Sequence, residues 1–373
     1  MSSVMAYSMT HTLLTSLLDN APATPGLSAI PVGFPVSRDG KSAWVGSRVS
    51  DTDFVCHLTE RERVEIYRAV VAFKELGLDG SHVSVDTFKL PTLGPRLVEL
   101  SLDVHNGLGF AVIRGINPQD YSVEDLTLAY MGIASYVADK RGRQDKLGNM
   151  LVHIVANKAN ENHHRHSTDP ITFHNEEAGD IVSWLTRGAA ASGGKCVIAS
   201  ATTVYNVLSA TRPDLVRVLA RGDWPFALPR YQCRPVLFHE DGKLIMNFGR
   251  APLLGSAAHP RKSRLPPLNT QQIEALDAIE AIARATEFQF ATQAGDIHFI
   301  NNLSVLHRRD GFVNDAASQR HLVRMRLRSS TFGWSIPPSL RREWFDAFER
   351  QSDKVWHIEP MPEHFAPLRK HPN

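Results

Sequence analysis

The sequence predicts a mainly β domain with flanking helices. Helical periodicity is concentrated in the first 140 or so residues, and strand-like apolar runs dominate from about 170 to 205 and again from 295 to 330. The chain has 373 residues, of which 43% are hydrophobic, so it can bury a substantial core. No internal repeat and no sharp change in composition divides the chain. One domain with helical decoration is the simplest interpretation.

The N-terminal region predicts an extended arm over residues 1–42, because prolines recur among small residues up to Pro35. The folded domain is then expected to span 43–373. Its first predicted helix covers 59–77, which opens with a Thr capping candidate, carries apolar residues mostly at helical spacing and stops at a glycine.

The pattern continues with a helix over 93–108, a buried strand over 109–116 and a third helix over 123–137. The segment 140–170 is polar and predicts a loop. A segment of about 207–290 interrupts the strand-rich half. It contains a Pro-rich aromatic stretch, a hairpin in FHEDGKLIMNF with its turn at Asp-Gly, and a helix in QQIEALDAIEAIARAT.

Charge and cysteine usage favour a small-molecule partner and a reducing compartment. The 41 Lys and Arg residues against 39 Asp and Glu residues provide no basic field for nucleic acid or a membrane surface. Cys56, Cys196 and Cys233 are scattered and odd in number, which fits neither a disulfide framework nor a zinc ribbon. No apolar run reaches ~18 residues, and the N-terminus lacks the charged start of a targeting signal. We expect a cytoplasmic protein.

The segment ITFHNEEAGDIVSWL predicts part of a metal site. Residues i and i+2 of an extended chain project from the same face, so His174 and Glu176 can point at one ion. One imidazole and one carboxylate are two-thirds of the 2-His-1-carboxylate triad that binds Fe(II) and leaves positions open. A surface histidine beside a solvated acid gives the same short pattern. A distant second histidine is required, and His307, which ends an apolar strand, is preferred to His298.

Several separated blocks carry a more specific signal than the pair of ligands does. They are GFAVIRGI, RGRQDKLGNMLVHI, FHNE followed by GD, SGGKCVIASATTVYN, RPDL, GDIHFINNLSVLHRRDGF and RHLVRMRL. In this order they resemble the TauD/TfdA-like 2-oxoglutarate dioxygenases, especially their fungal branch, with clavaminate synthase as a more distant relative. The likeness spans most of the chain.

The resemblance implies a fold, a cofactor and a reaction. The expected fold is a double-stranded β-helix, or jelly roll, of about eight core strands, with the 207–290 insert over its mouth. His174 and His307 match the two histidine ligands of Fe(II), and Glu176 stands where Asp is usual, as it does in clavaminate synthase-like members. The expected enzyme uses O₂ and the co-substrate 2-oxoglutarate. A homodimer is expected from the relatives alone.

The strand QRHLVRMRLR offers cationic partners for the far carboxylate of 2-oxoglutarate, a role that the planar fork of arginine suits. Arg320 and Arg324 match the two arginines that the family places on its last core strand. The first is expected to bind 2-oxoglutarate, and the second to lie close to it or to an anionic substrate. Arg326 and Arg328 are interpreted as structural. Cys196 stands where relatives have Thr or Ser, so it or a neighbouring hydroxyl such as Ser200 is expected to contact 2-oxoglutarate.

Gln144 and Asn302 are candidate substrate contacts, as are their neighbours Asp145 and Asn301, although each suits a turn equally well. The histidine run at 163–166 is interpreted as a solvated loop. Trp184, Trp224 and Phe226 are expected in packing.

The expected reaction is oxidation of an unactivated C–H bond of a small organic acid, amino acid or secondary-metabolite intermediate. Hydroxylation, desaturation and ring closure all remain open. Two other classes are weaker alternatives. A zinc hydrolase or deaminase would need a downstream P-C-x-x-C pair, which this sequence lacks. A non-catalytic jelly-roll binding protein would need a disabled metal site.

Overall fold

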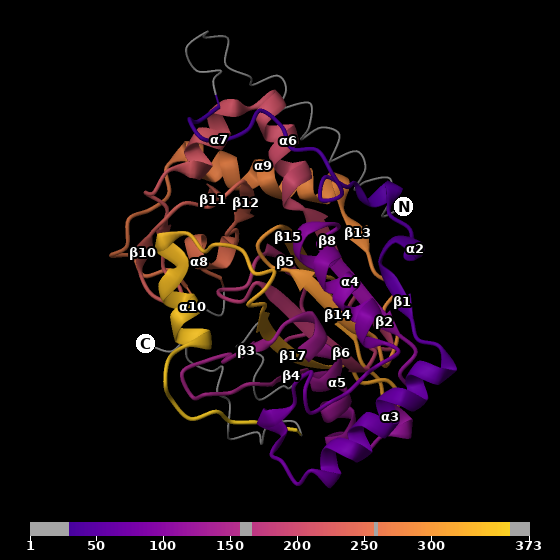
Figure 1. The fold of residues 1–373 in the computed structure, drawn as a ribbon. Coiled ribbons are helices and arrows are strands. Elements are labelled where there is room, and N and C mark those ends of the chain that lie inside the picture. The colour runs from indigo at the N-terminus through magenta and orange to yellow at the C-terminus, as the bar shows by residue number, and fades with distance from the viewer. Residues whose placement is uncertain (1–29, 157–165, 257–259, 359–373) are drawn as a thin grey trace.

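The computed structural model describes residues 30–156, 166–256 and 260–358. Figure 1 shows a central body of strands with α6, α7 and α9 at the top, α3 and α5 at the bottom, and α4 beside the middle of the strands. The described structure is therefore rich in sheet with flanking helices, as the sequence predicts.

The larger sheet has the strand order β1-β2-β14-β6-β17-β3, and β4 also pairs with β17. Strands β1 and β2 run parallel, and the remaining pairs are antiparallel. Its strands are β1 (Val55–His57), β2 (Phe110–Arg114), β14 (Ile297–Asn301), β6 (Ile181–Gly188), β17 (His321–Arg328), β3 (Lys140–Gly142) and β4 (Val152–Val155).

The smaller sheet has the order β13-β8-β15-β5 and is antiparallel throughout. Its strands are β13 (Phe288–Gln289), β8 (Cys196–Ser200), β15 (Val305–Arg309) and β5 (Ile171–His174). Three two-stranded ribbons accompany the sheets: β9 (Pro225–Phe226) with β10 (Gln232–Cys233), β11 (Leu237–Glu240) with β12 (Lys243–Met246), and β7 (Ser192–Gly193) with β16 (Phe312–Val313).

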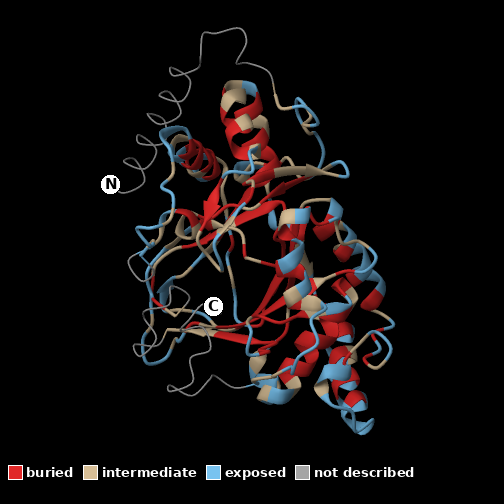
Figure 2. Ribbon diagram, turned by 90° about the vertical axis from the view of Figure 1, so that its left-hand side faces the viewer, coloured by how far each residue is buried: buried red, intermediate tan, exposed pale blue. Residues whose placement is uncertain are grey.

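Helices α3 (Glu60–Glu75), α4 (Gly94–Asn106) and α5 (Val123–Val137) pack on the outer face of the larger sheet. All three predicted helices are confirmed. Helix α3 begins with a capping box, in which the Thr59 hydroxyl accepts from the Glu62 backbone N–H and the Glu62 carboxylate accepts from Thr59 N–H. The buried face of α3 runs through Ile66, Val70 and Phe73, whereas Tyr67 is 54% exposed. Figure 2 shows these helices red toward the sheet and blue outside.

Helices α6 (Ala201–Thr211), α7 (Pro213–Ala220) and α9 (Thr270–Thr286) cover the outer face of the smaller sheet. Most of the 207–290 segment therefore backs this sheet. The strand expected to run to 205 ends earlier, because the Ser200 hydroxyl accepts from Thr203 N–H and caps α6. The predicted hairpin is confirmed, with φ of 45° at Asp241 and 71° at Gly242. The shorter helices are α2 (Asp51–Phe54), α8 (Arg250–Leu254) and α10 (Arg341–Phe348).

The polar segment 140–170 is only partly a loop. Strands β3 and β4 lie within it and both pair with β17. Strands of three and four residues have too little local pattern to be recognised. A partner more than 150 residues away in the chain stabilises them.

The space between the two sheets holds a separate hydrophobic cluster with residues from both, including Val182, Ile198 and Leu322. Along β17, alternate residues Val323 and Met325 pack outward against the α3–α5 layer. Of the arginines of the opposite parity, Arg320, Arg324 and Arg326 are buried on the other face of the sheet, and Arg328 is partly exposed. None of the described helices is long and apolar enough to cross a membrane.

Candidate metal centre

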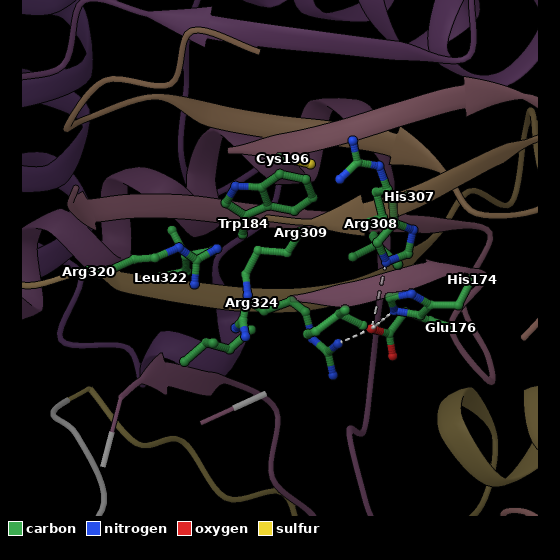
Figure 3. Close-up of a pocket in the computed structure, with 13 residues that line it drawn as sticks. His174, Glu176, Trp184, Cys196, His307, Arg308, Arg309, Arg320, Leu322 and Arg324 are labelled. Atoms are coloured by element: carbon green, nitrogen blue, oxygen red, sulfur yellow. Dashed lines mark hydrogen bonds and ion pairs between the residues drawn. The ribbon is translucent and has the colours of Figure 1, made fainter. Parts of the chain in front are cut away.

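Three predicted ligands converge at one edge of the smaller sheet. His174 ends β5, and the antiparallel register places it directly opposite His307 on β15. The Nε2 atoms of both rings lie 3.9 Å from Glu176 Oε1, and the three ligand atoms lie within 4.8 Å of one another. Figure 3 shows the three side chains pointing toward one another at the rim of a cavity. The pairing of two strands thus brings together residues 133 positions apart.

The donor set fits a divalent iron ion. Two imidazoles and one carboxylate form the set that non-haem Fe(II) oxygenases use, with the remaining positions open to ligands. The Nδ1 atom of His174 lies 2.9 Å from the Thr172 carbonyl oxygen, so the proton is assigned to Nδ1 and the Nε2 lone pair faces the site.

Asn302 holds the loop that carries Glu176. Its side-chain oxygen accepts from Glu176 N–H at 2.7 Å, and its amide donates to the carbonyls of Glu176 at 3.1 Å and Gly179 at 3.0 Å. These bonds explain the place of Asn302 without the predicted substrate contact. All its side-chain bonds go to the backbone of the metal loop.

The Arg324 side chain contacts Glu176, one of the three predicted iron ligands. Its guanidinium donates to Glu176 Oε1 and, at 3.0 Å, to Gln144 Oε1. Both Arg324 and Glu176 are buried. This pair orients the carboxylate, whereas the sequence placed Arg324 near 2-oxoglutarate or an anionic substrate.

Arg320 and Cys196 line the cavity that opens beside the three ligands, together with Trp184 and Leu322. Its volume is about 80 Å³. The Arg320 guanidinium stacks over the Phe312 ring at 5.2 Å, and burial lowers its pKa to about 10. Burial also raises the pKa of the Cys196 thiol to about 12, which keeps it neutral.

The Ser200 hydroxyl, the other predicted contact for the co-substrate, instead caps α6 and donates to the Ser42 carbonyl. Of the two predicted contacts for 2-oxoglutarate, Cys196 therefore lines the cavity beside Arg320, and Ser200 does not.

Two cavity-lining arginines were missed at the sequence level. Arg308 forms an ion pair with Glu287 at 2.7 Å, and Arg309 donates to the Ser167 carbonyl at 2.7 Å while stacking on Phe312 at 5.0 Å. They are the two residues after His307 on β15. Their place in the sequence next to a predicted iron ligand was the signal that could have identified them.

The other candidates have structural contacts. Asp145 accepts hydrogen bonds from Leu147 and Asn149 within its own turn, and Asn301 donates to the carbonyls of residues 104 and 105. Trp224 and Phe226 are buried in the core beneath α7 and α9. Of the predicted histidine run, 163–165 lies outside the described residues, and His166 contacts the Val155 carbonyl.

His298, the alternative ligand, lies apart from the metal centre. Its ring stacks on Trp184 with centroids 4.7 Å apart and planes at 12°. Neither ring nitrogen hydrogen-bonds to a described residue, and burial, followed by the charges of Arg114 and Arg320, lowers its pKa to about 3. His298 is a neutral core residue.

The depressed pKa of His298 predicts acid sensitivity. The folded state holds the ring neutral while the unfolded state protonates near pH 6.5, so the unfolded state binds more protons below that pH. The free energy of unfolding should fall by about 2 kcal/mol between pH 7 and pH 5 through this residue. Urea unfolding of His298→Gln at both pH values should show that much less pH dependence. Parallel pH profiles for the variant and the wild type would contradict the prediction.

Comparison with known proteins agrees with this arrangement. The family model described as "Taurine catabolism dioxygenase TauD, TfdA family" matches residues 73–326. A curated protein from Stachybotrys chartarum, named taurine hydroxylase-like protein SAT17, is 36% identical over 339 residues, covering 86% of this chain and 88% of its own.

Two solved structures share the fold at low sequence identity. An asparagine oxygenase in complex with Fe(II), 3-hydroxyasparagine and succinate aligns with a TM-score of 0.58 and 16% identity over 74% of this chain and 93% of its own. The non-haem iron oxygenase OrfP in complex with Fe and alpha-ketoglutaric acid aligns with a TM-score of 0.57 and 16% identity, over 73% and 93%. With the family match covering most of the sequence, the chain belongs to the TauD/TfdA family and is a non-haem iron, 2-oxoglutarate-dependent dioxygenase.

Proposed function

We propose that this dioxygenase oxidises an unactivated C–H bond of a small organic acid, amino acid or secondary-metabolite intermediate. The observation that carries the proposal is the convergence of His174, Glu176 and His307, whose ligand atoms lie within 4.8 Å of one another beside a buried arginine. When bound, iron and 2-oxoglutarate would activate O₂, the oxidant: one oxygen atom would enter succinate, which leaves with CO₂ from 2-oxoglutarate, and the other would oxidise the substrate. The outcome is hydroxylation, desaturation or oxidative cyclisation.

Each side chain has a defined task in this proposal. His174, Glu176 and His307 hold Fe(II), and Arg320 binds the far carboxylate of 2-oxoglutarate with Cys196 beside it. The Trp184 and Leu322 side chains belong to the packed cluster between the sheets and limit the access of water to this end of the cavity.

The proposal includes the architecture that the family implies. We infer that the two sheets form a double-stranded β-helix and that 43–373 is one catalytic domain, with about 207–290 inserted in it. Of the proposed arm at 1–42, the described part contacts α6, where Tyr205 and Ser209 donate to the carbonyls of Pro35 and Val36. A homodimer is proposed from the relatives.

An anaerobic titration tests the metal and co-substrate assignment. Fe(II) and 2-oxoglutarate together should give the weak visible charge-transfer band of the chelate, and neither alone should give it. Zn(II) in place of Fe(II) is the control, since a filled d shell gives no such band. Absence of the band at saturating 2-oxoglutarate would contradict the proposal.

Substrate choice is tested by 2-oxoglutarate-dependent succinate formation. The panel should include taurine, asparagine and arginine. One similar protein is named for taurine, and two solved structures contain hydroxylated asparagine or arginine. The correct substrate raises the succinate rate above its uncoupled level and is itself changed in mass by the addition of oxygen or the loss of two hydrogens.

A further inference from the structure

The Arg320 side chain lies against the short ribbon that β7 and β16 form. The antiparallel register of this ribbon sets Gly193 opposite Phe312. The Cζ atom of Arg320 lies 5.2 Å from the centroid of the Phe312 ring. Figure 3 shows Arg320 on the side of the cavity away from the three predicted iron ligands. The ribbon therefore contacts the group that is proposed to bind the far carboxylate of 2-oxoglutarate.

Two consecutive glycines shape the ribbon at this point. Gly193 and Gly194 have φ of 73° and 67°, in the left-handed region that favours glycine. A Cβ at position 193 would lie 2.2 Å from the Gly311 carbonyl oxygen, so the close approach of the two strands requires glycine there. The Gly194 N–H donates to the same oxygen at 3.1 Å. Gly193 thus serves the pairing of the strands, and Gly194 has a different neighbour.

The missing side chain at Gly194 leaves room for Arg320. A Cβ at position 194 would lie 3.1 Å from Phe312 Cβ, 3.2 Å from Arg320 Cδ and 3.3 Å from Arg320 Nε. Carbon atoms in contact are most stable at about 3.5–4.0 Å, so a methyl group would displace one of these neighbours. The Phe312 Cβ is attached to the backbone, whereas the arginine stem rotates about several bonds. The arginine is therefore the group that would move.

The backbone of Arg320 is fixed independently of the ribbon. Its N–H donates to the Asn314 side-chain oxygen at 3.0 Å, and β17 begins at the next residue. The guanidinium can therefore move only by rotation of its own stem. The Arg309 guanidinium lies 5.0 Å from the same Phe312 ring, and two positive charges at one ring repel each other. The contacts of Phe312 and Gly194 hold Arg320 in place against this repulsion.

We propose that Gly194 and Phe312 are positioning residues for the binding of 2-oxoglutarate. One end of the co-substrate binds the metal and its far carboxylate binds Arg320, so the guanidinium must be held in one place relative to the iron ligands. The inference rests on the proposed function, because both residues act through Arg320. Neither of them contacts the co-substrate in this proposal.

Titration of 2-oxoglutarate into protein loaded anaerobically with Fe(II), followed by the charge-transfer band, tests the proposal. Gly194→Ala should bind 2-oxoglutarate about 10-fold more weakly, which corresponds to the loss of about one hydrogen bond to a charged group. Phe312→Leu keeps an apolar side chain but removes the ring face beside the guanidinium, and it should weaken binding about 3-fold or more. Wild-type affinity in Gly194→Ala would overturn the proposal.

Gly77→Ala is the matched control for backbone strain. Gly77 has a φ of 63°, close to that of Gly194, but a Cβ there would meet no atom within 4 Å. Both alanine variants should unfold at a lower urea concentration than the wild type, because alanine is strained at such φ values. Only Gly194→Ala should lose affinity for 2-oxoglutarate. An equal loss in Gly77→Ala would mean that general destabilisation causes the effect, and the proposal would fail.

A double-mutant cycle determines whether the two positions act through Arg320. In an Arg320→Met background, Gly194→Ala or Phe312→Leu should change the affinity for 2-oxoglutarate less than about twofold, because the group that they position is gone. A further loss as large as that of the single variant would overturn the proposal. Absence of the band in the wild type contradicts the proposed function, whereas a normal wild-type band with full affinity in Gly194→Ala contradicts this inference alone.

Discussion

Replacing His307 with alanine is expected to lower the affinity for Fe(II) by more than about 100-fold, which exceeds the loss typical of removing an outer partner of a ligand. Only one imidazole and one carboxylate would remain of the three groups that converge in the structure. The charge-transfer band with 2-oxoglutarate should disappear at Fe(II) concentrations that saturate the wild type. Anaerobic titration followed by calorimetry measures both effects.

His307 is a better target than Glu176 for this experiment. Glu176 accepts from Arg324 and lies near Arg326, so removing its carboxylate leaves buried cations unpaired and destabilises the fold. The exposed His57 provides a control, and His57→Ala should bind Fe(II) as the wild type does. Wild-type affinity in His307→Ala would refute the assignment of the ligands.

Arg320→Met is expected to weaken 2-oxoglutarate binding by about 30-fold or more, since truncating one partner of a buried charge pair costs about 2–5 kcal/mol. Methionine keeps an apolar stem near Phe312, over which the guanidinium now stacks. The measurement is the 2-oxoglutarate dependence of the charge-transfer band at saturating Fe(II). Arg320→Lys should fall between methionine and wild type because it cannot donate two parallel bonds.

The stability of Arg320→Met separates a binding role from a structural one. Burial lowers the pKa of the Arg320 guanidinium to about 10, and no carboxylate of a described residue offsets that shift, so the charge is unfavourable in the ligand-free protein. The ligand-free variant should therefore unfold at a denaturant concentration no lower than the wild type does. Marked destabilisation together with unchanged 2-oxoglutarate affinity would show that Arg320 is structural.

Local pattern was sufficient where an element is long or has a strong terminal signal. The helix capped at Thr59, the helix over 123–137 and the Asp241-Gly242 hairpin all form as predicted. Strands β3 and β4 were missed because their formation depends on pairing with β17. Helix α6 was assigned in part to a strand because its cap, Ser200, directly ends β8.

The sequence alone predicted the ligand types from the alternation of an extended chain. In the structure β5 ends at His174, and Glu176 lies in the following loop, where Asn302 holds its backbone. The family blocks and the polar end of the His307 strand indicated the third ligand. The two-residue period of β17 also set which arginines share a face.

Tertiary structure decided what those arginines contact. Both faces of β17 are buried, which a pattern of alternating charge and apolar residues does not reveal, because the same pattern suits a half-exposed strand. The packing of the sheets pairs Arg324 with Glu176, leaves Arg320 beside Cys196, and places Arg326 within 3.8 Å of the carboxylates of Glu176 and Glu177. The physical reason is that the periodicity of a strand specifies only the direction of its side chains, whereas the partners come from segments more than a hundred residues away.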